Sequence, residues 1–334
     1  MSDSTTKRRA LIIISSARQL PLSSPKSVPS IPIGFFHVEL GQILAEFEDD
    51  FEFTLATPDG ETPQIDTNGW SLPWHATSQM TWVYGNSVAE FSDPDFTVEG
   101  YRKKYPELVE RRARELALLQ KHLGRLPVTE PLPHTDAENR AFHDEVVPQI
   151  ETWPTKKYFS LSELVRKHRD ESDEFSFAHF DFIHAPGGHA PMVDFHKNPW
   201  LGEVLHLARE NNVYISLICH APIALTSTNY RVDDAGQPYD VEGNPFLAAE
   251  ATTVSTSGET GMLDYGYVNI PGELTRLEYF VDQGLREAGF TVPAATVPTS
   301  LMLLPNPDLG LVTGNGPQTV DIQALDIRGR VGKR

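Results

Sequence analysis

Short apolar runs alternate with amphipathic segments along this chain, and this alternation constrains the fold more than any other feature. Runs bounded by glycine, proline or aspartate are typical of buried strands, and apolar side chains at helical spacing predict helices between them. The expected strands are 10–16, 51–60, 180–188 and 213–218, and the expected helices are 37–50, 106–123, 199–212 and 272–290. Strands alternating with helices of this length imply an α/β fold, a mostly parallel sheet with helices on both faces.

The segment from about 60 to 175 interrupts this alternation. It contains the strong helix candidate at 106–123 and a stretch with three prolines at 125–135. We expect a single domain, 1–334, in which this segment is a large helical insertion or cap. A surface elaboration with solvated charged faces is the alternative interpretation.

Charge and cysteine content restrict the partners and the compartment. A net charge of −18 argues against nucleic acid or an anionic membrane as the main partner. No apolar run reaches about 18 residues, so no membrane-spanning helix is expected. The run at 10–14 is too short for a secretory signal. Cys219 is the only cysteine, which excludes an internal disulfide and a zinc site with several thiolates, and favours the cytoplasm.

Cys219 lies in "YISLICHAPIAL", at the end of an apolar strand and before a predicted helix that begins at His220. A strand, a nucleophile and a helix in this order describe a nucleophile elbow. The unpaired N–H groups of a helix start favour thiolate over thiol, and thiolate is the reactive form. The alternative is a buried small apolar residue, which is the commoner fate of a free cysteine.

Two further segments point to the same edge of the sheet. In "APGGHAP", Gly187 and Gly188 allow close approach of the backbone, and their N–H groups could stabilise an oxyanion beside His189. A plain glycine turn is the alternative. "FFHVELGQ" places Glu39 in the first turn of the first helix, where an acid is most often only a dipole partner.

Together, Glu39, "GGHA" and "CHAP" resemble the ThiJ/PfpI superfamily, which shares the fold of class I glutamine amidotransferases. The C-terminal stretches at 266–292 and 311–320 look like the glyoxalase III branch, also described as heat-shock chaperones. The resemblance implies a flavodoxin-like sheet and a cofactor-free lyase that converts 2-oxoaldehydes such as methylglyoxal to 2-hydroxy acids. It also implies deglycase-like chemistry and a homodimer.

The same resemblance assigns roles to single residues. Cys219 looks like the nucleophile, and Glu39 is similar to the glutamate that hydrogen-bonds the thiol and relays a proton. His220 looks like the general base. Gly188 and His220 would supply oxyanion N–H groups, with Gly187 and His189 beside the substrate.

The third acid of the triad departs from the family pattern. The position that aligns best is Thr256 or Ser257, and neither is an acid. Glu259 and Asp264 are nearby candidates, of which we take Glu259. If neither orients His220, the triad is incomplete.

Histidine positions exclude one function and bear on metals. All twelve histidines lie at or before His220, so the amidotransferase triad, with its histidine far downstream of the cysteine, is impossible. Some relatives bind zinc through two histidines and a carboxylate. Glu46, Glu52 and His75 lie in the comparable region without a clear two-histidine match, so no metal or cofactor is expected.

Two other functions remain open at this stage. The protein could be a holdase chaperone or an oxidative-stress sensor, in which Cys219 is oxidised to the sulfinic level and stabilised by Glu39. It could also be a diverged hydratase or lyase with a specialised substrate. The missing acid near Thr256 and the large insertion favour such divergence.

Overall fold

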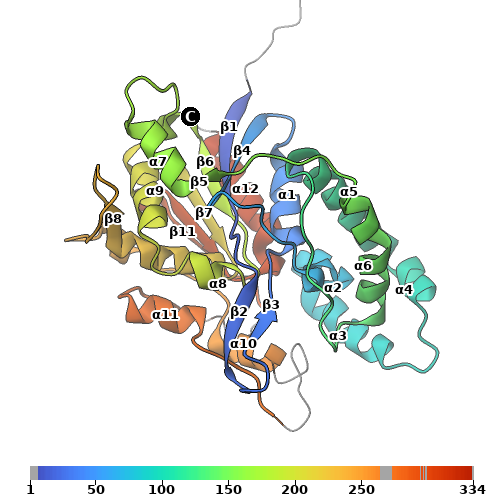
Figure 1. The fold of residues 1–334 in the computed structure, drawn as a ribbon. Coiled ribbons are helices and arrows are strands. Elements are labelled where there is room, and N and C mark those ends of the chain that lie inside the picture. The colour runs from blue at the N-terminus through green and yellow to red at the C-terminus, as the bar shows by residue number, and fades with distance from the viewer. Residues whose placement is uncertain (1–6, 264–272, 294, 296, 298, 333–334) are drawn as a thin grey trace, which may run out of the picture.

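A mostly parallel sheet forms the centre of the computed structural model, which describes residues 7–263, 273–293, 295, 297 and 299–332 (Figure 1). All neighbouring strands pair in parallel except the edge pair β11 and β12. This arrangement confirms the predicted flavodoxin-like α/β class. In spatial order the strands are β11 (Leu303–Asn306), β12 (Leu311–Gly314), β7 (Tyr214–Ile218), β6 (Phe182–Ala185), β1 (Arg8–Ile13), β4 (Phe51–Thr57) and β5 (Phe159–Ser160).

Helices surround this sheet, with α7 and α9 to its left and α1, α5 and α6 to its right in Figure 1. Among the described residues, no helix is both long and apolar enough to cross a membrane. The α-helices are α1 (His37–Phe47), α2 (Leu72–His75), α3 (Met80–Phe91), α4 (Val98–Lys104), α5 (Pro106–His122), α6 (Ala137–Ile150), α7 (Leu161–Arg169), α8 (Pro191–Asp194), α9 (Pro199–Glu210), α10 (Thr256–Met262), α11 (Val281–Glu287) and α12 (Val320–Val331). Smaller sheets contain β2 (Gln19–Ser24), β3 (Ser30–Pro32), β8 (Tyr230–Val232), β9 (Pro238–Asp240) and β10 (Arg276–Leu277).

Strand β1 shows why its residues from Ala10 to Ile13 are all apolar. Successive strand residues point to opposite faces of a sheet, and here both faces are covered. Leu11 and Ile13 belong to the core that includes α9. Ile12 belongs to the opposite core, with Leu40 of α1 and Leu119 of α5. An apolar residue is therefore required at each position from Ala10 to Ile13, whereas Arg8 and Arg9 before them are not buried.

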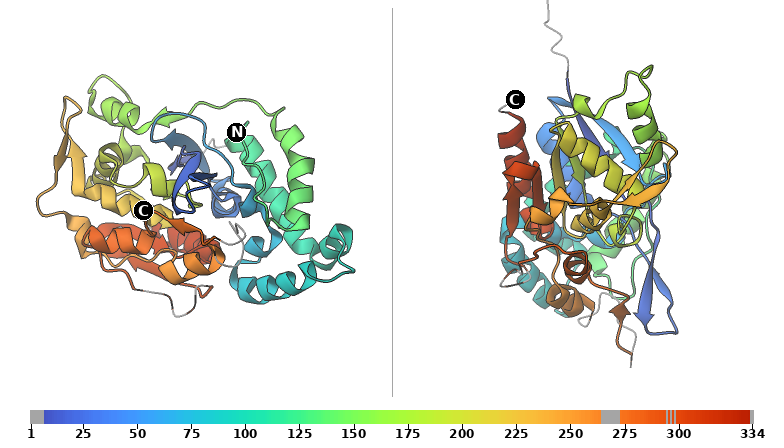
Figure 2. Two further views of the ribbon diagram at one scale, coloured as in Figure 1. Left: turned by 60° about the horizontal axis from the view of Figure 1, so that its bottom comes forward. Right: turned by 90° about the vertical axis from the view of Figure 1, so that its left-hand side faces the viewer.

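Helices α2–α6 lie between β4 and β5 in the sequence and gather on one side of the sheet, as Figure 2 shows. Their contact with the central fold is close at Gly41 of α1, where an added Cβ would lie 2.6 Å from Cβ of Glu115. Glycine at this position therefore lets α5 approach α1. The division into one domain with an insertion or cap at about 60–175 stays a prediction.

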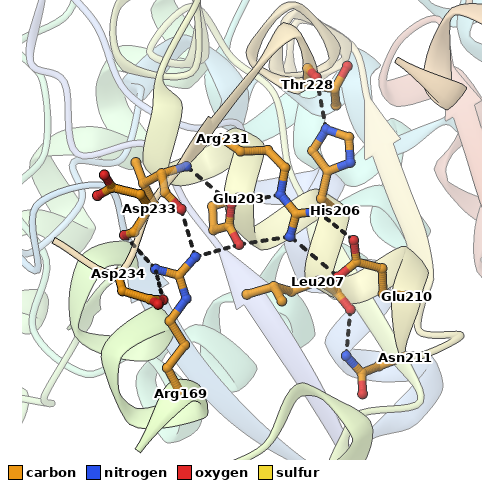
Figure 3. A network of polar contacts seen from close by, with 11 residues as sticks. Arg169, Glu203, His206, Leu207, Glu210, Asn211, Thr228, Arg231, Asp233 and Asp234 are labelled. Atoms are coloured by element: carbon orange, nitrogen blue, oxygen red, sulfur yellow. Dashed lines mark hydrogen bonds and ion pairs between the residues drawn. The ribbon is translucent and has the colours of Figure 1, made fainter. Parts of the chain in front are cut away.

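The buried carboxylate of Glu203 links α7, α9 and β8 through hydrogen bonds (Figure 3). Glu203 of α9 accepts hydrogen bonds of 2.9 Å from both Arg169 and Arg231. Arg169 also donates to the carbonyl of Val232 at 2.7 Å. Burial by itself raises the pKa of Glu203, but the two arginines outweigh it and hold that pKa below its usual value. This network is structural and contains no group that faces the site described below.

Two of the predicted helices differ in the structure. The helix expected at 272–290 is wrong in its first half. Arg276–Leu277 form strand β10, in which Leu277 pairs with Leu22 of β2, and α11 begins only at Val281. Strand pairing with a distant segment overrides the helical spacing here. The segment after Cys219 is a 3₁₀-helix, Ala221–Asn229, with a proline at its start.

Substitution of Gly202 in α9 tests how closely this helix is packed. A Cβ at this position would lie 2.1 Å from the carbonyl oxygen of Ser227 and 2.3 Å from that of Tyr230. These are backbone atoms, which cannot move away without a large cost in free energy. We expect Gly202→Ala to lower the free energy of unfolding by about 3 kcal/mol, measured by denaturant titration. Gly329→Ala is the matched control, because a Cβ there meets nothing within 4 Å and α12 gains helix propensity. Equal destabilisation by both substitutions would contradict this packing.

Candidate active site

Cys219 follows β7 directly and has a left-handed backbone, with φ of 63°, which residues other than glycine rarely adopt. Its N–H donates to the carbonyl of Gly314 at 2.8 Å. Its carbonyl accepts from the hydroxyl of Thr253 at 2.5 Å. Hydrogen bonds on both sides hold the strained conformation in place. The backbone at Cys219 thus has the sharp turn of a nucleophile elbow.

The glycine loop after β6 lies directly against this elbow. A Cβ on Gly187 would lie 2.5 Å from Cβ of Cys219. Gly188 has φ of 84°, and a Cβ there would lie 2.3 Å from the carbonyl oxygen of Gly34. Both positions therefore require glycine. The N–H of Gly188 reaches the sulfur and counteracts the rise in its pKa.

Glu39 lies in the first turn of α1 and is fully buried beside the same loop. Its Oε2 accepts the N–H of Gly187 at 2.7 Å. Burial raises the pKa of Glu39 to about 8, although hydrogen bonds with the Cys219 thiol and with Gly187 oppose the rise. The carboxyl group is therefore mostly protonated at neutral pH.

The thiol of Cys219 is protonated in the resting protein. Burial, and then the neighbouring Glu39, raise its pKa well above the usual value, and the N–H of Gly188 only partly offsets them. The sequence-based expectation that the elbow favours thiolate is outweighed by this desolvation. A base must therefore remove the proton as the sulfur attacks.

His220 is placed to be that base. Its Nδ1 lies 3.2 Å from the sulfur of Cys219, and its Nε2 lies 2.8 Å from Oε2 of Glu259. The other oxygen of Glu259 lies 2.7 Å from Nε2 of His189. Because Glu259 accepts the Nε2 proton of His220, Nδ1 is left to accept the thiol proton. One carboxylate thus orients two histidines.

The charges of these three groups follow from their surroundings. Burial by itself raises the pKa of Glu259, but His189 and His220 outweigh it and hold that pKa well below its usual range. Burial opposes protonation of His189, yet Glu259 outweighs it and raises that pKa. The pKa of His220 is lowered, chiefly by burial. The arrangement favours a carboxylate, a protonated His189 and a neutral His220.

A pocket of about 110 Å³ opens in front of the sulfur. Aromatic side chains from α1's start, α2 and α3 form one wall, and the loop after β12 forms another. Besides Cys219, His189 and His220, its lining includes Phe36, Trp74, Tyr84, Asn315 and Gln318.

No protein-family model and no curated protein matches this sequence. Among solved structures, Rapid Encystment Protein 24 KDa of Francisella tularensis is similar over 97% of this chain and 99% of its own, with TM-score 0.53 and 17% identity. Glyoxalase III from Candida albicans covers 97% of each chain, with TM-score 0.49 and 14% identity. A ThiJ/PfpI domain protein from Brachyspira murdochii covers 98% and 99%, with TM-score 0.43 and 9% identity.

The chain shares its fold with Rapid Encystment Protein 24 KDa. At these identities the likeness shows the fold and not the activity. In this fold the crevice opens where connections leave the sheet in opposite directions, here between β1 and its neighbours β4 and β6. Glu39 follows β1 through the β2–β3 segment, the glycines follow β6, and Cys219 follows β7.

This fold brings together seven residues singled out in the sequence. They are Glu39, Gly187, Gly188, His189, Cys219, His220 and Glu259. Ser257 is exposed, Thr256 donates to Asp282, and Asp264 lies outside the described residues. The sharing of Glu259 by His189 was not predicted, nor were Trp74 and Tyr84 in the pocket, because no local pattern links 74–84 to the elbow.

Glu39→Gln tests the buried carboxyl group through stability. The pKa of Glu39 rises from 4.5 to about 8 on folding, so its contribution is fully present below about 4.5 and is lost as pH rises through 8. Glutamine keeps an acceptor for Gly187 and does not ionise. We expect the variant to gain roughly 2 kcal/mol over wild type between about pH 5 and about pH 8, measured by urea unfolding. A difference that does not change with pH would rule out this environment.

Proposed function

We propose that this protein is a glutathione-independent, cofactor-free cysteine enzyme of the glyoxalase III type. It would convert small 2-oxoaldehydes such as methylglyoxal to 2-hydroxy acids. The observation that carries the proposal is the hydrogen-bonded line from Cys219 through His220 to Glu259, which faces a pocket of small volume. The likeness to glyoxalase III is in keeping with this proposal but does not carry it.

The first step is addition of sulfur to the aldehyde carbon. Nδ1 of His220 accepts the thiol proton as the carbon–sulfur bond forms, and Glu259 stabilises the resulting imidazolium. The carbonyl electron pair moves to oxygen, to which the N–H of Gly188, the group that faces the sulfur, would donate a hydrogen bond. The proton then passes from His220 to that oxygen and gives a hemithioacetal.

The second step moves hydrogen from the former aldehyde carbon to the adjacent carbon. His220, or Glu39 in its ionised form, removes the proton from the first carbon and returns it to the second, while the hydroxyl proton of the first carbon moves to the oxygen of the second. The product is a thioester of the 2-hydroxy acid. A pKa of about 8 suits Glu39 to proton transfer near neutral pH. Water then cleaves the thioester and regenerates the thiol. The net change is addition of one water, with no oxidant or reductant.

The pocket supports a small substrate. A volume of about 110 Å³ suits a carbonyl compound of a few carbon atoms better than a long chain. Phe36 and Trp74 offer apolar surface for a methyl group, and Asn315 and Gln318 offer polar groups for the second carbonyl. A deglycase using the same chemistry would have to present its adduct through this opening.

The alternatives have less support. A redox sensor usually has an accessible cysteine of low pKa, whereas Cys219 is 4% exposed and its pKa is raised. Glu259 takes the place of the acid missing near Thr256, which removes one argument for a diverged lyase. A cytoplasmic homodimer stays a prediction from the resemblance.

A holdase role has one observation in its favour, the exposed Trp82 and Val88 of α3. It predicts that suppression of aggregation of a heated client survives Cys219→Ala and falls when Trp82 and Val88 are replaced by serine.

Cys219→Ala tests the proposed chemistry directly. Wild type and variant are incubated with methylglyoxal without glutathione, and lactate formation and its handedness are measured. We expect wild type to form lactate and the variant to fall to background, because no other residue of this chain carries a thiol. Ser257→Ala is the control, since Ser257 is exposed in the same helix as Glu259. Full activity in Cys219→Ala would refute the proposal.

Glu259→Gln tests the relay. The variant keeps the size of the side chain but cannot stabilise a positive charge on His220. We expect kcat to fall by about 10²- to 10⁴-fold with little change in KM. The rate of thiol alkylation by iodoacetamide should fall in parallel, because His220 then draws the thiol proton away less readily. Unchanged kcat and alkylation would show that Glu259 does not orient the base.

A further inference from the structure

We infer that His37, His75 and Glu115 form a second site, which binds a divalent transition-metal ion such as Zn²⁺. The three side chains come from α1, α2 and α5, and each is almost completely buried. Their candidate ligand atoms all lie within 4.8 Å of one another. Two imidazoles and one carboxylate are a common ligand set for zinc, and they leave a fourth position open.

The distances suit such an ion. Oε2 of Glu115 lies 2.9 Å from Nδ1 of His75 and 3.5 Å from Nε2 of His37. Two ligands about 2.0–2.1 Å from a tetrahedral zinc are separated by roughly 3.3 Å. The rings of His37 and His75 meet edge to face, 5.4 Å between centres, so both can present a nitrogen to one point. Small side-chain adjustments would bring all three atoms to ligand distance.

His37 provides an independent observation that points to a ligand. Neither of its ring nitrogens has a hydrogen-bond partner among the described residues, although the side chain is fully buried. Buried polar groups in folded proteins nearly always have a partner, and a metal ion would supply one for His37.

Hydrogen bonding already orients the carboxylate of Glu115 for binding a metal ion. Nε of Arg111, one turn earlier on α5, donates to Oε1 of Glu115 at 2.8 Å. Arg111 is itself held by Asp321 of α12. Outer partners of this kind fix a ligand's orientation and leave its other oxygen free to bind. Gly41 completes the arrangement, because it lets α5 bring Glu115 up to α1.

This site differs from two other groups of possible ligands. Glu46 lies at the far end of α1 and binds Arg328, and Glu52 is exposed, so neither joins His75. His189 and His220 already share Glu259 through hydrogen bonds. Among the described residues, the group containing His37 is set apart by the two buried ring nitrogens of His37, which have no hydrogen-bond partner.

An ion at this position would join α2 and α5 to the first turn of α1, the turn that carries Glu39. It would thus connect the segment between β4 and β5 to the candidate active site. We expect metal binding to stabilise the folded protein by mass action.

Metal-stripped protein provides the test. Wild type is titrated with Co²⁺, followed by visible absorption, and with Zn²⁺ in competition, and thermal unfolding is recorded with and without Zn²⁺. We expect one ion per chain and a rise in Tm. His37→Ala and Glu115→Gln should weaken binding by about 100-fold or more, because loss of a ligand should exceed loss of an outer partner. His37→Gln replaces His37→Ala if the latter does not fold.

Matched controls separate this site from the other two groups. Glu46→Gln and Glu259→Gln should retain the ion and its effect on Tm. Failure of wild type to bind Co²⁺ or Zn²⁺ stoichiometrically would overturn the inference. Binding lost in Glu259→Gln and kept in His37→Ala would also overturn it, because the ion would then lie between His189 and His220. Failure of wild type to bind either ion would leave the proposed chemistry of Cys219 unaffected, because that chemistry uses no metal. An ion held by His189, His220 and Glu259 would contradict that chemistry as well, because His220 could not then act as the base.

Discussion

The left-handed backbone of Cys219 is the constraint on which the candidate site depends. A residue with a side chain holds this conformation only when its surroundings impose it, and here the end of β12 and Thr253 bond its N–H and carbonyl. The turn places the sulfur against Gly187 and beside Nδ1 of His220. A relaxed backbone would separate the sulfur from both. The strained backbone and the candidate nucleophilic sulfur therefore belong to the same residue, Cys219.

Burial then determines how protons are distributed. It keeps Cys219 and Glu39 protonated at rest, and it would also neutralise Glu259 if two histidines did not share that carboxylate. The negative charge is held on Glu259, which in turn raises the pKa of His189. This leaves a neutral His220 as the acceptor nearest the thiol. Nucleophile activation in such a site requires a base in contact rather than a permanently ionised thiol.

The segment between β4 and β5 contributes to function by position. Its helices α2 and α3 supply Trp74 and Tyr84 to the pocket, and α2 and α5 bring His75 and Glu115 to His37. Both contributions meet the start of α1, the helix that carries Glu39. The segment thus offers the central fold side chains that the sheet's own loops do not provide.

Local pattern was sufficient for much of this protein. The apolar runs and helical spacing predicted the parallel sheet and most of its helices. Each element buries one or both faces, and the spacing of apolar residues within the element itself shows which faces these are. "GGHA", "CHAP" and Glu39 likewise indicated the elbow and its neighbours, since these follow successive strands that end at one edge. The helix expected at 272–290 failed where Leu277 pairs with a distant strand.

Long-range packing decided the rest. The choice of Glu259 as the acid that meets His220, the sharing of that carboxylate with His189, and the raised pKa of Cys219 depend on segments that meet only after folding. The meeting of His37, His75 and Glu115 depends on helices far apart in the chain. The sequence by itself therefore determined the sheet and singled out Cys219 as the candidate nucleophile, because these follow from local periodicity and spacing. Only the tertiary structure decided the hydrogen-bond partners and the charges of the site residues. Desolvation and hydrogen bonding act between residues that are far apart in the sequence, so no local sequence pattern reports them.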